Sequence, residues 1–271
     1  MEVLNSHLVG AYGAYDTRFI KLALYLKAWN KARFPDKMRR LNSFCIYLML
    51  IAFLQQRGVL PNLQALAPDS QPTRFQLQYK TWEYVGWADA KFVRPDQFNT
   101  LVDLPRFYET MGLGSDDAAG SGSAEEAKSG GIDLPTEGQA DLSVGQLLLE
   151  FFEFYGYTFE NAKYAIDIRH TESRRHLPRR PAPFRLRQDY VNEAQHELEA
   201  QAEKNSQFTT QCLFLSHRYQ MYLMADPFNR SYNPAKVQAA SETAQQYKNA
   251  FRRAFIDLKQ RLPAKQAQQL Q

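Results

Sequence analysis

Cysteine and long apolar runs are both scarce in this sequence of 271 residues. Its two cysteines, Cys45 and Cys212, lie far apart in apolar surroundings, which excludes a zinc cluster or a disulfide framework and indicates a reducing compartment. The longest apolar run covers only the 11 residues 44–54, whereas a membrane-spanning helix needs about 18 or more. No lysine or arginine precedes Arg18, unlike in a secretory signal or an arginine-rich transit peptide. We therefore expect an intracellular protein, cytoplasmic or mitochondrial, with no membrane partner.

Common catalytic and metal-binding motifs are missing as well. No glycine-rich phosphate loop follows a strand pattern, no Gly-x-Ser-x-Gly motif occurs, and the five histidines do not have the spacing of metal ligands. We therefore expect no metal site and no catalytic residue in this chain. Hydrophobic residues make up 44% of the sequence and aromatic residues 13%, which is enough for one large or two modest domains with hydrophobic cores.

Charge is unevenly distributed around the net value of +4. Residues 112–145 hold seven acidic residues and one lysine, whereas residues 169–187 hold seven arginines and one glutamate. The arginines are Arg169, Arg174, Arg175, Arg179, Arg180, Arg185 and Arg187. Such a concentration favours a polyanion partner such as RNA, although runs of charge are more often solvated faces.

The spacing of prolines in this basic segment predicts an irregular, extended arm over residues 169–187. Pro178, Pro181 and Pro183 oppose a helix, and guanidinium groups on such an arm can pair with phosphates or stack on unpaired bases. A solvated loop, or an arm docked on an acidic protein, would fit the same pattern.

Apolar spacing predicts a mainly α fold. Helices are expected at 4–34 with a break and N-cap at Asp16-Thr17, and at 44–56, 143–155, 188–207 and 241–262. Residues 163–169 alternate like a strand, and residues 75–92 fit an edge strand or an extended wrap. The expected organisation is a first helical part (1–111), a flexible acidic Gly/Ser-rich insert (112–141), a second structured part (142–262) with the basic arm and the polar helix 188–207, and a tail (263–271).

Four ordered blocks resemble a known family. They are LNSHLVGAYGAYDTRFIKLALYLKAWNKAR (4–33), LNSFCIYLMLIAFLQQRGVLPNLQ (41–64), LSVGQLLLEFFEFYGYTFENAKYAIDIR (142–169) and ADPFNRSYN (225–233). The first two resemble the central domain of noncanonical RNA nucleotidyltransferases, the terminal uridylyltransferases and related poly(A) polymerases, and the last two resemble their poly(A)-polymerase-associated segment. The resemblance implies a helical central domain, like the substrate-binding domain of poly(A) polymerases and oligoadenylate synthetases, with a small α+β poly(A)-polymerase-associated region.

The resemblance also implies roles for eight residues. Asn5 matches a contact to the nucleotide sugar, and Phe44 an aromatic residue that stacks on the base. The triphosphate ligands would be Lys27, Lys31 and Ser43, and the base-edge residues would be Asp226, Asn229 and Tyr232. A spacing of four independently puts Lys27 and Lys31 on one helix face, whereas Ser43 could equally cap a helix and Phe44 could pack in the core.

Two departures from the family limit what we expect of the chain. Uridylyl enzymes commonly have an acid at the position of Asn229 and a histidine at that of Tyr232. The family's Gly-Ser motif and three metal-binding carboxylates do not occur before Asn5, so we expect a truncated product, half of a split enzyme, or a reused remnant that is not catalytic alone.

Two functions remain open, and with them the question of whether the chain acts as an enzyme. The first is the nucleotide- and RNA-binding portion of a terminal RNA nucleotidyltransferase, which would use magnesium with UTP or ATP when completed by a catalytic domain on a separate chain. The alternative is a degenerate, noncatalytic RNA-binding or scaffold subunit of a larger ribonucleoprotein, such as a mitochondrial RNA-processing or ribosomal complex.

Overall fold

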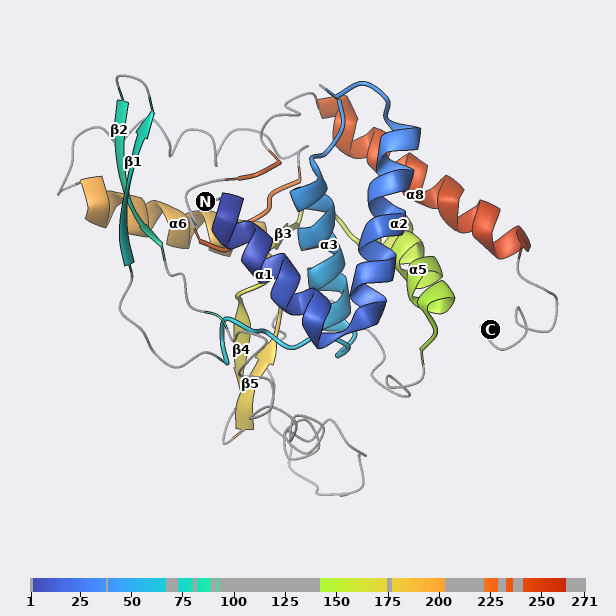
Figure 1. The fold of residues 1–271 in the computed structure, drawn as a ribbon, viewed down its shortest axis with the longest axis horizontal. Coiled ribbons are helices and arrows are strands. Elements are labelled where there is room, and N and C mark those ends of the chain that lie inside the picture. The colour runs from blue at the N-terminus through green and yellow to red at the C-terminus, as the bar shows by residue number, and fades with distance from the viewer. Residues whose placement is uncertain are drawn as a thin grey trace.

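Helices dominate the part of the chain that the structure describes (Figure 1). The computed structural model describes residues 2–37, 39–66, 73–79, 82–88, 92, 142–174, 177–202, 222–228, 233–235 and 241–261. The expected insert 112–141 and the expected tail 263–271 both lie outside these residues. The prediction of a mostly helical fold is confirmed.

The first three helices begin where the sequence predicts. Helix α1 covers Glu2–Tyr15, α2 covers Thr17–Arg33 and α3 covers Ser43–Gln56. The side chains of Asp16 and Asn42 cap α2 and α3, accepting hydrogen bonds of 2.8 Å from the backbone N–H groups of Arg18 and Cys45. In Figure 1, α1 and α3 run down the page, and α2 runs back up to the right of them. The caps therefore fix the turns at which the chain reverses.

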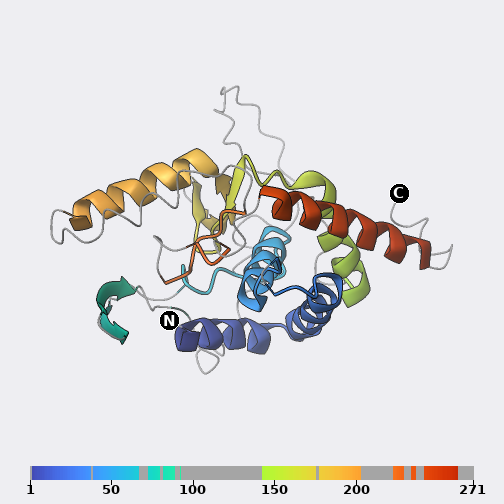
Figure 2. The ribbon, with the colours of Figure 1, turned by 90° about the horizontal axis from the view of Figure 1, so that it is seen from above.

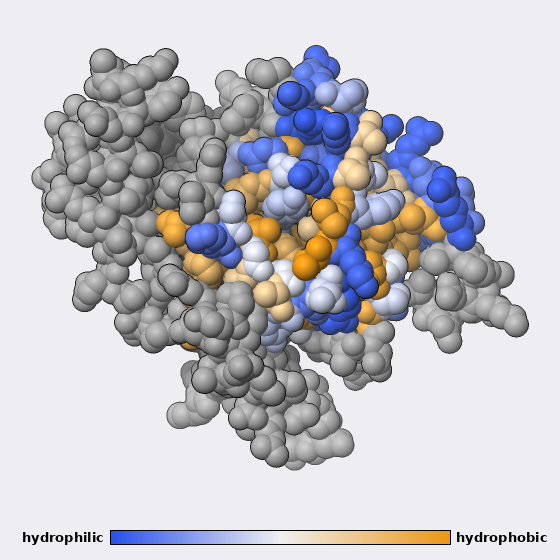
Figure 3. Space-filling view, viewed as in Figure 1, coloured by the Kyte–Doolittle hydropathy of each residue, from blue (hydrophilic) through white to orange (hydrophobic). Residues whose placement is uncertain are grey.

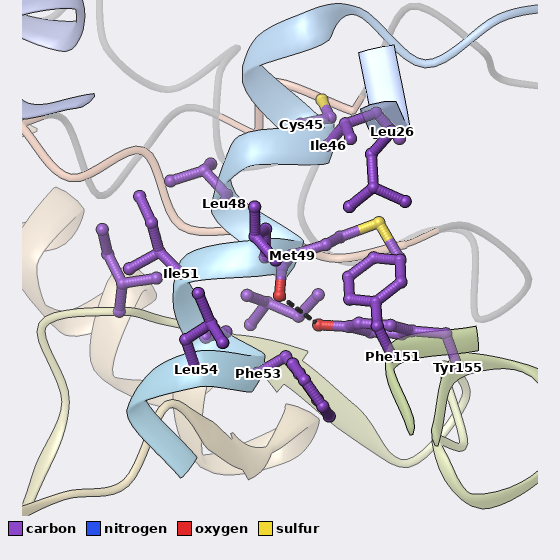
Figure 4. Close-up of a cluster of buried hydrophobic side chains, with 14 of the residues drawn as sticks. Leu26, Cys45, Ile46, Leu48, Met49, Ile51, Phe53, Leu54, Phe151 and Tyr155 are labelled. Atoms are coloured by element: carbon purple, nitrogen blue, oxygen red, sulfur yellow. Dashed lines mark hydrogen bonds between the residues drawn. The ribbon is translucent and has the colours of Figure 1, made fainter. Parts of the chain in front are cut away.

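Helix α3 forms the centre of the hydrophobic core. From Cys45 to its end, every residue except Tyr47 is buried, so its apolar run needs neighbours on all sides. Figure 4 shows Leu26 of α2 and the rings of Phe151 and Tyr155 along one side of α3. The hydroxyl of Tyr155 donates a hydrogen bond of 2.7 Å to the backbone carbonyl of Met49.

The second structured part supplies the rest of the core. Helix α5 (Val144–Glu153) continues into a π-helical turn, η4 (Phe154–Thr158), and the long helix α8 (Ser241–Arg261) packs against both. Trp29 of α2 stacks on Phe251 of α8 with ring centroids 5.2 Å apart. Residues from both ends of the described chain thus share one core.

Strands in the described residues form three two-stranded antiparallel sheets. β1 (Thr73–Tyr79) pairs with β2 (Trp82–Ala88), which confirms a strand in the ambiguous segment 75–92. β3 (Tyr164–Ile166) pairs with β6 (Phe184–Leu186), and Ile166 also bridges to Met224.

The prediction of an irregular arm over 169–187 is wrong. β4 (Thr171–Arg174) pairs with β5 (Leu177–Pro181) in a hairpin, and α6 (Arg187–Ala202) begins directly after β6. The register shifts between Glu172 and Arg174, which leaves an extra residue in β5 where Pro178 lies, and proline is tolerated at such an irregularity and on the edge strands of a sheet. Figure 2 shows α6, the expected polar helix, extending away from the helical core. No helix of the described residues is long and apolar enough to cross a membrane.

Candidate functional site

The start of α3 is the centre of the candidate site. Ser43 and Phe44 are its first two residues, and both are half-buried. The free N–H groups and positive dipole end of a helix N-terminus favour a bound anion such as phosphate. Phe44 also packs against the main core, so one side of its ring is used structurally.

A buried hydrogen bond joins the end of α2 to this point. The side-chain amide of Asn30 donates a hydrogen bond of 2.8 Å to the backbone carbonyl of Leu41, two residues before Ser43. Lys31 follows Asn30 directly and Lys27 lies one turn earlier, and both lysines are exposed. The α2 segment that carries the two predicted triphosphate ligands is therefore fastened beside the start of α3.

A loop from the C-terminal part lies against the same end of α3. Asn42 donates through its side chain to the backbone carbonyl of Pro234 at 3.2 Å. Gln64, which follows α3, donates to the carbonyl of Pro227 at 3.0 Å. These two bonds tie Pro227, the neighbour of Asp226, and Pro234 to α3 and to the segment that follows it.

Asp226 itself is almost completely buried beside the first turn of α3. Its side chain accepts a hydrogen bond of 2.9 Å from the backbone N–H of Phe228, and its exposed fraction is 2%. Burial raises the pKa of the Cys45 thiol, and the negative charge of Asp226 raises it further, which reflects how close the two groups lie. The structure thus brings together Asp226, Ser43 and Phe44, whereas Asn229 and Tyr232 lie outside the described residues.

Asn5 shows an unusual lack of hydrogen bonding. Its side-chain oxygen is buried and has no hydrogen-bond partner within the described part of the chain. An unsatisfied buried acceptor lowers the stability of the fold by about 1–3 kcal/mol. A ligand hydroxyl that donates a hydrogen bond to this oxygen would recover part of that free energy. Asn5 lies in the first turns of α1, and in Figure 1 the N-terminal ends of α1 and α3 both lie toward the top of these two helices.

Three of the seven predicted RNA-binding arginines are held inside the second structured part. Arg169 and Arg185 are only 10% and 11% exposed, and both lie within 3.7 Å of the buried carboxylate of Asp167. Arg185 also pairs with Glu193 at 2.6 Å, and Arg187 is buried, with a guanidinium hydrogen bond of 3.0 Å to the carbonyl of Asn161. Their placement on an exposed arm is therefore wrong, because acidic and carbonyl groups of the same fold neutralise them.

Three of the other four arginines belong to the β4–β5 hairpin. Arg174 ends β4, Arg179 and Arg180 lie in β5, and Arg175 lies outside the described residues. We call this region the hairpin surface.

A second basic region was missed in the sequence. Residues 17–40 contain eight lysines and arginines and one acid, Asp36. Arg33, Lys37 and Arg39 are exposed on the end of α2 and the loop that follows it; we call these three residues the loop surface. Figure 3 shows hydrophilic residues gathered over this end of the molecule. A charge count by window would have found it, but these cations are interleaved with the apolar residues of α2 and form no visible run.

No group of three or more His, Cys, Asp or Glu side chains among the described residues is arranged to hold a metal ion.

Sequence comparison identifies relatives of this chain. Residues 143–195 match the sequence profile of the Cid1 family poly A polymerase. Terminal uridylyltransferase 4 of Mus musculus is 30% identical over 184 residues, which are 62% of this chain and 11% of that protein. Poly(A) RNA polymerase cid13 of Schizosaccharomyces pombe is 26% identical over 175 residues, 63% of this chain and 23% of that protein. The chain is homologous to terminal uridylyltransferases and poly(A) RNA polymerases. It spans less than a quarter of the length of these two relatives.

Solved structures agree with this relationship at the level of the fold. A cytoplasmic RNA terminal U-transferase superposes with a TM-score of 0.55 at 20% identity, covering 96% of this chain and 58% of that one. Cid1 in complex with the UTP analog UMPNPP superposes with a TM-score of 0.53 at 19% identity, covering 97% and 60%. The expected family resemblance is confirmed, and the described residues form an RNA nucleotidyltransferase-like region.

Proposed function

We propose that this chain is the nucleotide- and RNA-binding portion of a terminal RNA nucleotidyltransferase, built from a helical central domain and a poly(A)-polymerase-associated region. The observation that carries the proposal is the meeting of three distant segments at the start of α3. The bonds from Asn30 to Leu41 and from Asn42 to Pro234 bring the lysines of α2 and the loop of Asp226 to Ser43. These are residue types that a nucleoside triphosphate requires: cations, a helix N-terminus and a base-edge acceptor.

Each residue then has a part in holding the nucleotide. Lys27, Lys31 and Ser43 would bind the triphosphate, Phe44 would stack on the base, and Asn5 would accept a hydrogen bond from the sugar. Asp226 would read the base edge together with Asn229 and Tyr232. UTP or ATP would enter with magnesium, whose role is to neutralise the phosphate charge and, with the carboxylates of a catalytic domain, to support transfer. The residues of this chain would bind and orient the nucleotide.

A titration of the purified chain with UTP and with ATP in the presence of magnesium tests this function. Replacing Lys27 and Lys31 together by alanine should weaken binding about 30-fold, since each exposed charge contact is worth about 1 kcal/mol. The control variant Lys21→Ala/Lys259→Ala removes the same charge from exposed positions on α2 and α8 and should bind like the unmodified chain. Binding of neither nucleotide by the unmodified chain would contradict the proposal.

The RNA part of the proposal rests on the two basic surfaces, which lie at opposite ends of α3. The loop surface adjoins the start of α3, whereas Gln55 near its end donates a hydrogen bond of 3.1 Å to the carbonyl of Ile168, shortly before the hairpin. A helix of this length spans about 20 Å, and Figure 1 shows the hairpin β4–β5 on the opposite side from the α2–α3 loop. An RNA whose 3′ end reaches the nucleotide would meet the loop surface first and the hairpin surface further along the strand.

A noncatalytic RNA-binding subunit of a larger ribonucleoprotein is the second candidate function. The differences from uridylyl enzymes at Asn229 and Tyr232 favour it, because they alter the residues expected to select uracil. Tight RNA binding by a chain that binds no nucleoside triphosphate would favour this function over the first.

A further inference from the structure

A tyrosine from the C-terminal helix completes the junction between α2 and α3. The hydroxyl of Tyr247 in α8 donates a hydrogen bond of 2.5 Å to the side-chain oxygen of Asn30. The same hydroxyl accepts a bond of 2.8 Å from the backbone N–H of Leu41. Since Asn30 also donates to the carbonyl of Leu41, the three residues form a closed network, and all three are buried.

The network fixes the position of Leu41 relative to α2 and α8. Leu41 lies outside any helix, so its N–H and C=O would be unsatisfied in the core without Tyr247 and Asn30. The ring of Tyr247 stacks on Phe34 with centroids 4.0 Å apart and planes 19° apart, which holds the hydroxyl in place. Burial raises the pKa of Tyr247 above its ordinary value of 10.0, so the phenol keeps the proton that it donates to Asn30.

The network lies between the two groups that would hold a triphosphate. Lys31 directly follows Asn30, and Ser43 comes two residues after Leu41. Between them, Asn42 bonds to Pro234, seven residues before α8 begins at Ser241. Two C-terminal residues thus hydrogen-bond to adjacent residues before α3: Tyr247 to Leu41, and Pro234 to Asn42.

We propose that Tyr247 and Asn30 are positioning residues for the triphosphate: they set the lysines of α2 and the start of α3 at the separation at which both reach one chain of phosphates. This rests on the proposed function, in which Lys27, Lys31 and Ser43 bind the triphosphate. Affinity for phosphates then depends on a hydroxyl group of α8 that touches no nucleotide. The sugar contact of Asn5 and the base-edge contact of Asp226 come from other segments and do not pass through this network.

The test compares UTP with UMP in binding to a variant that loses only the hydroxyl. Tyr247→Phe keeps the ring and its stacking but breaks both hydrogen bonds. UTP affinity should fall about tenfold, because the cations no longer meet the phosphates in one geometry, whereas UMP affinity should stay within about twofold. Adding Lys31→Ala should cost less in the Tyr247→Phe background than in the unmodified chain, since coupled residues are not additive.

Tyr155→Phe is the matched control. It removes another buried tyrosine hydroxyl, the one bonded to Met49 in the middle of α3, and should lower stability without changing UTP affinity. Each affinity is calculated from the concentration of folded protein, which circular dichroism measures. If Tyr247→Phe folds poorly, Asn30→Ala serves as the second variant. Unchanged UTP affinity in the variant, or an equal loss for UMP or in the Tyr155→Phe control, would overturn the inference. Failure of the unmodified chain to bind either UTP or ATP would instead contradict the proposed function; if it binds ATP alone, the comparison is made with ATP and AMP.

Discussion

The backbone of Gly156 lies against the backbone of Arg252. The carbonyl oxygen of Gly156 accepts a hydrogen bond of 2.7 Å from Arg252 Nε, and a Cβ atom on Gly156 would lie only 3.1 Å from the backbone nitrogen of Arg252. This is the point at which the π-helical turn η4 meets α8. Because the neighbouring atom belongs to a helix backbone, it cannot move aside as a flexible side chain would.

Gly156→Ala should therefore destabilise the fold by about 1–3 kcal/mol, as an extra methyl group does in a closely packed core. Urea unfolding measures the change. Gly10→Ala is the matched control, because a Cβ there would meet nothing within 4 Å and alanine is favoured over glycine inside a helix by about 0.5–1 kcal/mol. Equal midpoints for Gly156→Ala and the unmodified chain would contradict the close approach.

Local signals in the sequence account for most of the fold that could be predicted. The helices α1, α2, α3, α5 and α8 follow from apolar spacing and from capping residues such as Asp16 and Asn42, which act within one turn. The hairpin β4–β5 could not be predicted, because its two prolines are unfavourable locally and acceptable only once the strands have paired. The burial of Arg169 and Arg185 depends on Asp167 and on Glu193 of α6, a neighbour that only the fold supplies.

Some residues of the candidate site could likewise be predicted from the sequence, and others could not. Lys27, Lys31 and Ser43 could be proposed from the resemblance, because it reads residues in order along the chain. Asn30 could not be found, since one asparagine on an amphipathic helix carries no signal. Its partner Tyr247 is 217 residues away, so the connection exists only in the folded chain.

Asp16 combines two contacts that can be separated by mutation. It caps α2 and also pairs with the guanidinium of Arg18 at 2.7 Å, and this hydrogen bonding raises the pKa of Arg18. Asp16→Ala should lower the free energy of unfolding by about 1–2 kcal/mol, the usual cost of losing a cap. Asp16→Asn keeps the capping oxygen and should recover most of that loss. Thermal unfolding of both variants checks this, and equal losses would show that the charge, not the cap, matters.

Alkaline pH should unfold the chain because burial holds five of its described tyrosines as neutral phenols. Burial raises the pKa of each above its ordinary value of 10.0; they are Tyr12, Tyr15, Tyr155, Tyr222 and Tyr247. Their contribution is complete below pH 10, where the phenols of the unfolded chain keep their protons too. As the pH rises beyond 10 the unfolded chain releases protons that the folded chain retains, and stability falls by about 1.4 kcal/mol per pH unit for each tyrosine.

Urea unfolding at a series of pH values between about 8 and 11 measures this slope. Tyr222→Phe removes one of these five titrating phenols and should make the decline above pH 10 shallower by about one fifth. A slope that stays the same in this variant would contradict the assignment.

The two basic surfaces should differ in the length of RNA that they bind. Arg33→Ala/Lys37→Ala/Arg39→Ala alters the loop surface, beside the candidate site, and Arg174→Ala/Arg179→Ala/Arg180→Ala alters the hairpin surface. The loop variant should weaken binding of single-stranded RNA of both about 5 and about 20 nucleotides, because both reach the start of α3. The hairpin variant should weaken only the longer RNA.

Salt dependence distinguishes a phosphate contact from a loss of fold in either variant. Each phosphate neutralised on a single strand contributes about −0.7 to the slope of log affinity against log salt, so removing three contacts should flatten the slope by about 2. Filter binding at several salt concentrations measures it, and the effect should be similar for RNAs of different sequence because phosphates carry no sequence information. If the loop variant binds the short RNA with the slope and affinity of the unmodified chain, the loop surface does not contact RNA. If the hairpin variant binds the long RNA with the slope and affinity of the unmodified chain, the hairpin surface does not contact RNA.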